Sequence, residues 1–187
     1  MPAISMTSQV EAASKVLSDG GVIAYPTEYC FGLGCDPRNL QAITRVLKIK
    51  QRSPDQGLIL IAGTIEQVDE YADLSRVSQM DRLTNSWPGP NTWLLPCRPS
   101  VSNLIKGSHT SIAMRIPSHD FCLKLLENFG HPIVSTSANR SGQKEHLNSE
   151  SIKLDLGNEC DLIVDLPVGN TGQASTIRDA LTGKTLR

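Results

Sequence analysis

Short runs of aliphatic residues alternate with amphipathic stretches along this chain, and this alternation constrains its fold more than any other feature. Residues 58–62 (LILIA) are apolar on both faces of an extended strand, whereas residues 39–50 (NLQAITRVLKIK) carry apolar side chains at helical spacing. A strand without a polar face has to be covered on both sides by other elements. The interleaving of such strands with helices predicts an α/β fold with a mixed sheet covered by helices, and we expect one domain over residues 1–187.

The same two patterns locate the remaining elements. They predict helices over residues 8–19, 39–50, 64–73, 75–86, 119–130 and 149–156. They predict strands over residues 21–28, 58–62, 111–117, 132–138, 162–167 and 175–179. Residues 87–90 (WPGP) break the chain between the fourth helix and the segment 92–98.

Composition excludes several classes of protein. Apolar residues make up 39% of the chain and charged residues 20%, which excludes a disordered chain, a collagen-like repeat and a coiled coil. No apolar run approaches the length of about 20 residues that spans a bilayer. Residues 1–15 lack the basic and apolar segments of a secretory signal. We therefore expect a cytoplasmic protein without a membrane partner.

The cysteines are scattered, without a CxxC pair and without a histidine at zinc-site spacing. This distribution predicts no metal site built from protein ligands alone. In a cytoplasmic chain such cysteines are expected to be small buried hydrophobic residues. They are Cys30, Cys35, Cys97, Cys122 and Cys160.

Charge is distributed unevenly although the net charge is only −1. Two segments, residues 37–54 and 82–119, contain basic residues and no acid. The basic residues are Arg38, Arg45, Lys48, Lys50, Arg52, Arg82, Arg98, Lys106 and Arg115. If the two segments meet in the fold, they form a positive surface that attracts phosphates, and a solvated helix face is the plainer alternative.

Two glycine-containing segments approach nucleotide-binding motifs, but neither motif is complete. Gly32 and Gly34 would need the third glycine of a dinucleotide fold at Pro37, and a proline does not allow that close helix packing. Residues 183–185 (GKT) would need the first glycine of a phosphate-binding loop at Arg178. The sequence therefore predicts neither of these ATP folds.

Four polar segments beside predicted strand ends carry the candidate site, and the first two lie in the N-terminal third. Thr27 and Glu28 stand at the end of the first predicted strand and place a hydroxyl and a carboxylate near a glycine-rich segment that a ligand can approach. Lys50 and Arg52 close a basic helix. The compact ammonium charge of Lys50 beside the planar guanidinium of Arg52 suits a polyphosphate. Alternatively, the two cations stabilise the C-terminus of the helix by interacting with its dipole.

The other two segments lie in the second half of the chain. Arg115 lies inside the otherwise apolar strand 111–117, where it requires an anionic partner because an unpaired buried charge is strongly destabilising. That partner is either an acid of the protein or a bound carboxylate or phosphate. Residues 135–142 (STSANRSG) supply hydroxyls and an amide that can wrap a phosphate or a ribose, or that form a plain polar turn.

With these segments in this order, the sequence resembles the YrdC/TsaC family of threonylcarbamoyl-AMP synthases in its short bacterial form. The matching stretches are AYPTEYCFGLGCDP, LKIKQRSPDQGLILIA, WPGPNT, SIAMRIPSH, PIVSTSANRSG and STIRDALTG. They run from about residue 8 to residue 187. The resemblance implies a single YrdC-like domain, in which a twisted mixed sheet is flanked by helices and has a positively charged concave face.

The resemblance also implies the reaction. A nucleotidyltransferase of this family joins L-threonine, bicarbonate and ATP into threonylcarbamoyl-adenylate and releases pyrophosphate, with Mg²⁺ carried by the ATP phosphates. The product serves threonylcarbamoyladenosine modification of tRNA next to the anticodon. The implied partners therefore include tRNA, bound directly or through downstream threonylcarbamoyl-transferase proteins. In such a reaction the protein supplies mainly positioning and charge neutralisation.

Individual positions follow from the same resemblance. Lys50 and Arg52 match the family's catalytic basic pair, which faces the nucleotide phosphates. The L-threonine site falls on Thr27, Arg115, Ser135 and Ser175. The ATP site falls on Lys50, Arg52, Ser111, Ser137, Asn139 and Arg187. Gln56 stands where the family usually has a lysine, so either ATP binds more weakly or Lys48 or Lys106 supplies the charge.

Two other functions compete with the synthase. An RNA-binding module would hold duplex RNA or tRNA on the positive surface, with strongly salt-dependent binding and no pyrophosphate release. Only eight aromatic residues are present, which argues against base stacking. A carbamoyl-adenylate domain like that of hydrogenase-maturation proteins is the other alternative, but those chains add an acylphosphatase domain and zinc fingers.

Overall fold

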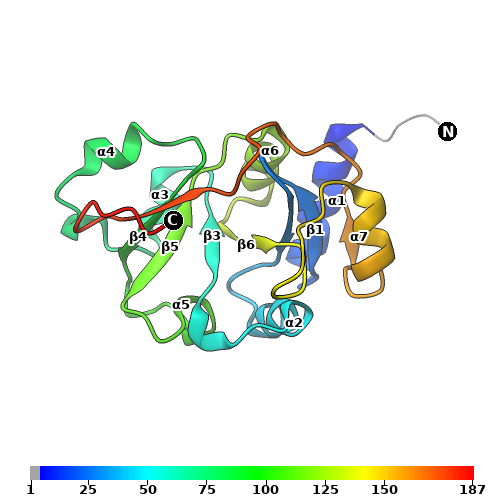
Figure 1. Ribbon diagram of the computed structural model, residues 1–187, viewed down its shortest axis with the longest axis horizontal. Helices are drawn as coiled ribbons and strands as arrows, with labels where there is room; N and C mark the ends of the chain where they lie inside the picture. Colours follow the sequence, from blue (N-terminus) through cyan, green and yellow to red (C-terminus); the bar gives the residue numbers. More distant parts are fainter. Residues whose placement is uncertain (1–4) are drawn as a thin grey trace.

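Eight strands form one sheet in the computed structural model, which describes residues 5–187 (Figure 1). The strands are β1 (Ile23–Pro26), β2 (Phe31–Gly34), β3 (Ile59–Ile61), β4 (Asn91–Pro96), β5 (Ser111–Arg115), β6 (Ile133–Ser137), β7 (Leu162–Ile163) and β8 (Thr176–Asp179). Their order across the sheet is β7-β1-β2-β6-β3-β5-β4-β8. Parallel pairs (β1 with β7, β3 with β5, β4 with β8) occur beside antiparallel pairs, which confirms the predicted mixed sheet.

Helices cover both faces of this sheet. They are α1 (Met6–Ser18), α2 (Leu40–Lys50), α3 (Ile65–Asp69), α4 (Met80–Thr84), α5 (Asn103–Lys106), α6 (Asp120–Phe129) and α7 (Ser149–Leu156), with 3₁₀ turns η1 (Pro54–Gln56) and η2 (Leu74–Arg76). Within residues 5–187, none of them is long and apolar enough to cross a membrane. Side-chain caps fix where several begin: the Asn39 carboxamide oxygen, for example, accepts from the second and third backbone N–H groups of α2.

Strand β1 shows how alternate residues are divided between the two faces. Ile23 and Tyr25 pack in a cluster with the buried sides of α1 and α6, whereas Ala24 between them joins the cluster that contains the buried side of α2. Successive side chains of a strand point to opposite faces, so a strand that is apolar throughout can bury both. The sheet therefore separates an α1–α6 layer from an α2 layer.

Most predicted elements are confirmed, and the differences have physical reasons. The helix predicted over residues 75–86 is wrong: the chain forms η2, leaves it at Val77 and resumes helical structure only in α4. Val77 is buried with extended backbone angles, so core packing overrides the helical pattern there. Residues 31–34, where no strand was predicted, form β2 inside the sheet, because glycine has no side chain to signal a strand.

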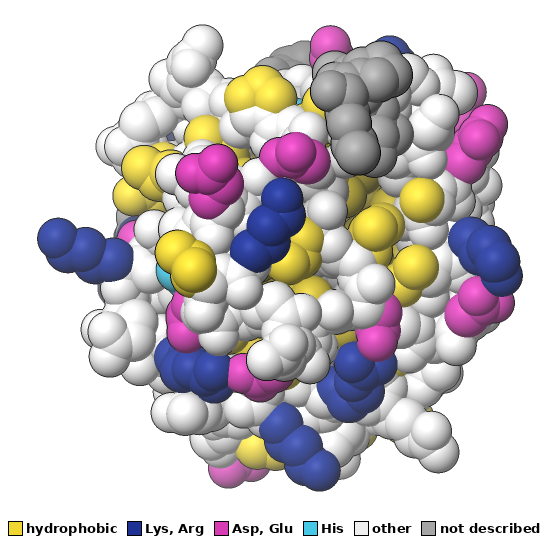
Figure 2. Space-filling view, turned by 90° about the vertical axis from the view of Figure 1, so that its right-hand side faces the viewer, with side chains coloured by type: hydrophobic (Ala, Val, Ile, Leu, Met, Phe, Trp, Pro, Cys, Tyr) yellow, Lys and Arg dark blue, Asp and Glu magenta, His cyan; other side chains and the backbone are white. Residues whose placement is uncertain are grey.

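Ion pairs neutralise part of the two basic segments. Arg38 pairs with Asp36, Arg45 with Asp161 and Arg98 with Asp69, so these three cations contribute little to a surface of one sign. At the end of the molecule that carries α1 and α7, Figure 2 shows Lys and Arg side chains interspersed with Asp and Glu. A further group of cations lies elsewhere, around the cavity described below.

Two glycines with a positive φ differ in the space around them, and one of them lies where η1 and α5 are in close contact. Gly107 follows α5 with φ +66°, and a Cβ at this position would lie 2.3 Å from the Asp55 carbonyl oxygen. Gly130 ends α6 with φ +78°, and a Cβ added there would meet no heavy atom of the described residues within 4 Å. Both glycines have a positive φ, but only Gly130 is in the αL conformation, and the two differ in the space around them.

Gly107→Ala should therefore destabilise the protein far more than Gly130→Ala. For Gly130→Ala we expect only the cost of a left-handed alanine, about 1 kcal/mol. For Gly107→Ala the overlap with backbone should add at least about 2 kcal/mol. Equilibrium unfolding in urea measures both values. Equal losses would show that η1 and α5 do not depend on this close contact.

Candidate functional site

A cavity of about 360 Å³ opens on one face of the sheet. Alternate residues of β5 form part of its floor: Ser111, Ala113 and Arg115 line the cavity, while Ile112 and Met114 are buried in the apolar core. The same strand therefore serves the core with one face and the cavity with the other. This explains how a charged side chain occurs in a strand whose neighbouring residues are apolar.

The cavity brings together segments that are far apart in the sequence. Eight of the ten predicted site residues line it: Thr27, Arg52, Ser111, Arg115, Ser135, Ser137, Ser175 and Arg187. Lys50 and Asn139 do not line it and lie behind its wall. The residues predicted for L-threonine and for ATP thus border one continuous space.

Glu28 is the anionic partner that the sequence left open for Arg115. The Arg115 Nη1 donates to Glu28 Oε2 at 2.9 Å, and the two residues are only 8% and 5% exposed. The second carboxylate oxygen accepts from the Ser118 backbone N–H at 2.8 Å. Among the described residues, Arg115 Nε and Nη2 have no hydrogen-bond partner, yet neither is a buried atom. Two guanidinium donors are therefore available to a ligand in the cavity.

The backbone around Glu28 also holds the segment that closes one side of the cavity. This segment, residues 164–175, is called the strap because it runs from β7 to β8. The Gly169 N–H donates to the Thr27 carbonyl at 2.8 Å, and Thr171 donates to the Glu28 carbonyl through both N–H and hydroxyl. A Cβ on Gly169 would lie 2.9 Å from Glu28 Cα, so only glycine allows this approach. The strap places Ser175 at the cavity, where its hydroxyl lies 2.8 Å from that of Thr92.

Hydrogen bonds within the wall fix the direction of two cavity hydroxyls. The Thr27 hydroxyl donates to the Cys30 carbonyl at 2.8 Å, so its oxygen faces a ligand as an acceptor. The Ser137 hydroxyl donates to the Asn139 Oδ1 at 2.6 Å and is likewise left as an acceptor. Side chains that are already oriented lose little freedom when a ligand binds.

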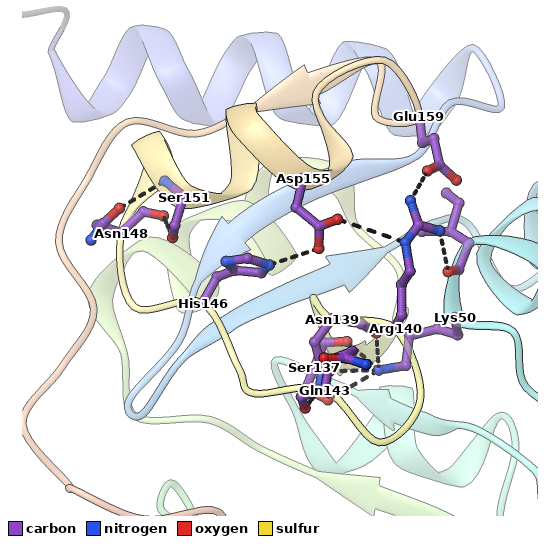
Figure 3. Close-up of polar contacts among 11 residues, drawn as sticks. Lys50, Ser137, Asn139, Arg140, Gln143, His146, Asn148, Ser151, Asp155 and Glu159 are labelled. Atoms are coloured by element: carbon purple, nitrogen blue, oxygen red, sulfur yellow. Dashed lines mark hydrogen bonds and ion pairs between the residues drawn. The ribbon is translucent and has the colours of Figure 1, made fainter.

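Lys50 lies behind the Ser137 hydroxyl, in the wall of the cavity (Figure 3). Its ammonium donates to four oxygens, the Ser137 carbonyl at 2.6 Å, the Ser137 Oγ at 3.2 Å, and the Asn139 carbonyl and Oδ1, both at 2.7 Å. Burial, together with the neighbouring Arg52 cation, lowers the pKa of Lys50 to about 8. At pH 7 the amine is still mainly protonated and fastens the segment that follows β6.

The loop after Asn139 is tied to α7 by a second set of charged groups (Figure 3). Arg140 pairs with Glu159 at 2.5 Å and with Asp155 at 3.6 Å, and the His146 ring lies 3.0 Å from the other oxygen of Asp155. Glu145 of this loop lines the cavity. These contacts fix the loop that forms one rim of the cavity.

Two further arginines are held at the rim by carbonyl oxygens. Arg52 donates to the Gly57 and Gln56 carbonyls at 3.1 and 3.2 Å, and Arg187 donates to the Ser175 carbonyl at 3.1 Å. Gln56 also lines the cavity. Of the two lysines considered as substitutes for a charge there, Lys106 lines the cavity and Lys48 does not.

Cations outnumber acids around the cavity. The lining cations are Arg52, Lys106, Arg115 and Arg187, and the lining acids are Glu28 and Glu145. One of the acids is already paired with Arg115. The remaining charge favours an anionic ligand.

Several lining residues were not predicted from the sequence. Glu28 carried a signal, because it directly follows a buried strand, but its ion pair with Arg115 depends on the fold. Thr92, Thr171 and Gln173 carried none, since only the arrangement of strands and strap brings them to the cavity.

The cysteines differ in burial, and Cys30 is the one that reaches the cavity. Cys30, Cys35 and Cys122 are buried, as predicted, while Cys97 and Cys160 are partly exposed. Cys30 lines the cavity, but burial raises the pKa of its thiol to about 11, so it is protonated at neutral pH. Among residues 5–187 no three or more His, Cys, Asp or Glu side chains are grouped so that they could hold a metal ion.

Similarity to known proteins extends over nearly the whole chain. Residues 15–187 match the model of the Sua5/YciO/YrdC family, whose description reads "Telomere recombination". The threonylcarbamoyl-AMP synthase of Vibrio vulnificus (strain YJ016) is 44% identical over 184 residues, which make up 97% of this chain and 99% of that protein.

Two solved structures share the architecture. Sua5 of P. abyssi in complex with L-threonine is 29% identical, with a TM-score of 0.85 over 94% of this chain. This chain spans about half, 52%, of the length of that protein. YciO of E. coli is 26% identical, with a TM-score of 0.81 over 97% of this chain and 91% of its own.

The wall behind the cavity provides a test of Lys50. Lys50→Met would remove the ammonium from all four oxygens, although Asn139 Oδ1 would still accept from the Ser137 hydroxyl and the Ser137 carbonyl from the Asn139 N–H. The free energy of unfolding should therefore fall by about 3 kcal/mol. Lys48→Met is the matched control, because Lys48 lies on the same helix with an exposed side chain and should change stability by less than about 0.5 kcal/mol. Urea unfolding measures both variants. A loss as small as that of the control would mean that Lys50 does not stabilise the wall.

Proposed function

The chain belongs to the Sua5/YciO/YrdC family, and we propose that it is a threonylcarbamoyl-AMP synthase, which joins L-threonine, bicarbonate and ATP and releases pyrophosphate. The observation that carries this proposal is the single cavity in which residues expected for L-threonine and for ATP lie together. Its volume is that of a small-molecule site. The similarity to a synthase of nearly the same length, from Vibrio vulnificus, supports the same activity.

At the threonine end, Arg115 binds the substrate carboxylate. Its Nε and Nη2 form a planar fork that matches two carboxylate oxygens, while Glu28 keeps Nη1 occupied and the guanidinium in place. The Thr27 oxygen is directed as an acceptor, so it suits the N–H of the substrate amine or carbamate. Ser135 and Ser175 supply the other hydroxyls of this end.

At the nucleotide end, Arg52 and Arg187 neutralise the phosphates, and Ser111 and Ser137 contact the nucleotide. Lys106 supplies the amine beside Gln56. In this proposal Lys50 and Asn139 act from behind the wall, by fixing Ser137. Magnesium enters as part of the MgATP substrate, where it neutralises phosphate charge.

The reaction needs two bond-forming steps. Bicarbonate takes up a proton and loses water to give CO₂. The neutral threonine amine attacks the carbon of this CO₂ and gives up a proton, which forms the carbamate. A carbamate oxygen then attacks the α-phosphorus of ATP, and the bond to the β-phosphate oxygen breaks as pyrophosphate leaves. No side chain bonds covalently to the substrates, so the protein contributes positioning and stabilisation of charge.

The arrangement of cations favours this enzyme over an RNA-binding module. Arg52, Arg115 and Arg187 surround a cavity instead of forming a stripe along the surface. A stripe would be expected for a phosphate backbone. We place tRNA later in the sequence of events, as the final acceptor of the threonylcarbamoyl group through downstream transferase proteins, in the cytoplasm.

Pyrophosphate release by the purified protein tests the proposed function. With MgATP in bicarbonate buffer, release should require both L-threonine and bicarbonate, because the carbamate is the nucleophile. Omission of either should reduce the rate to that of a sample without protein. Release that continues without threonine would contradict the proposal, and so would a folded protein that releases none.

Substitutions at Arg115 test its role within that activity. Arg115→Ala should abolish threonine-dependent release. Arg115→Lys keeps a charge beside Glu28 but removes the planar fork, so the KM for L-threonine should rise at least about tenfold. Arg45→Lys, in a half-exposed ion pair with Asp161 away from the cavity, is the control and should leave that KM unchanged. An Arg115→Lys variant with the wild-type KM would remove Arg115 from the carboxylate site.

A further inference from the structure

Ser135 lies in the middle of the cavity floor. It is paired with Ile59 of β3, which is paired in turn with Ala113 of β5, and all three line the cavity. Arg115 lies two residues further along β5, on the same face. A hydroxyl at this place can reach the same ligand as the Arg115 guanidinium. The direction of its proton is therefore relevant to threonine binding.

Tyr25 reaches Ser135 from two strands away. It lies on β1 opposite Gly32 of β2, and Gly32 lies opposite Ser137 of β6, so the three share one face of the sheet. Two strand spacings amount to about 10 Å, a distance that only a long side chain crosses. The Tyr25 ring is completely buried and packs against Phe121 of α6 with a centroid separation of 6.4 Å.

The glycines of β2 make this path possible. A Cβ on Gly34 would lie 2.8 Å from Tyr25 Cε1, and a Cβ on Gly32 would lie 3.3 Å from Tyr25 Cζ. A side chain at Gly34 would therefore overlap the ring, and one at Gly32 would press on its phenolic end. The G-x-G pattern that failed as a dinucleotide motif is thus explained by the passage of Tyr25 across the strand.

The hydrogen bond at the end of this path has a definite direction. The Tyr25 hydroxyl donates to Ser135 Oγ at 2.7 Å. Burial raises the pKa of Tyr25 well above its ordinary value, so the phenol stays protonated and remains the donor. Within residues 5–187 no acceptor for the Ser135 proton is found, and Ser135 borders the cavity. The serine proton is therefore free to be donated to a ligand there.

We propose that Tyr25 is a positioning residue that orients the Ser135 hydroxyl, so that this hydroxyl donates its proton to an anionic oxygen of L-threonine or of its carbamate. The proposal rests on the proposed function. Tyr25 itself does not line the cavity and acts only through Ser135. A donated bond from the phenol also polarises the serine hydroxyl and makes it a better donor, because hydrogen bonds in a chain strengthen one another.

Tyr25→Phe tests this role with the loss of one oxygen atom and no loss of ring packing. The KM for L-threonine should rise about tenfold, as for the loss of one hydrogen bond to a charged group, and the KM for ATP should change less than about twofold. Tyr71→Phe is the matched control, because Tyr71 is partly buried and lies outside the cavity lining. A Tyr25→Phe variant with the wild-type KM for threonine would overturn the inference, as would equal increases in both KM values.

A double-mutant cycle separates positioning from a general effect on the fold. Ser135→Ala should raise the KM for threonine, and Tyr25→Phe should add nothing in that background, because the two side chains act as one unit. Additive increases would overturn the inference. Pyrophosphate release by the wild-type protein tests the proposed function itself. Release that does not depend on threonine would overturn the proposed function and this inference with it. Threonine-dependent release combined with an unaffected Tyr25→Phe variant would overturn the inference alone.

Discussion

A guanidinium inside a β-strand is stable only beside an anion, and in this protein Glu28 is that anion for Arg115. The pair does more than satisfy a buried charge. One Glu28 carboxylate oxygen accepts from Arg115 and the other from the Ser118 backbone N–H. The Glu28 carbonyl accepts from Thr171 of the strap. One residue, in the bend between β1 and β2, therefore holds Arg115, the segment after β5 and the strap.

Most other cavity groups are also fixed before any ligand binds. Arg52 and Arg187 are held by carbonyl oxygens, and Lys50 holds Ser137 and Asn139 from behind. A phosphoryl-transfer site with little covalent chemistry of its own gains from such rigidity, because catalysis then consists of positioning and prearranged charge. The face of the sheet opposite the cavity packs into the apolar core, which supports this arrangement.

The sequence predicts the fold well wherever a pattern belongs to a single element. Residues 58–62 and 39–50 form the expected strand and helix, because their apolar spacing fits one geometry. Residues 31–34 were missed as a strand, since the reason for Gly32 and Gly34 is a tyrosine on the neighbouring strand. The helix predicted across Val77 was wrong because burial of that one side chain, a tertiary effect, breaks the pattern.

The same distinction holds for the candidate site. Motifs predict which residue types meet, and eight of the ten predicted residues do lie around one cavity. They do not predict on which side of the wall a residue lies, as Lys50 shows. Nor do they predict a partner from a distant part of the chain: the need of Arg115 for an anion was visible in the sequence, whereas its pairing with Glu28 was not.

In the proposed function, Arg115 is held by Glu28 and binds the carboxylate of L-threonine. Calorimetric titration of the purified protein with L-threonine and with L-threonine amide measures this directly, because the two ligands differ only at that group. If Arg115 binds the carboxylate, the amide should bind at least about tenfold more weakly than L-threonine. Equal affinities for the two ligands would contradict it.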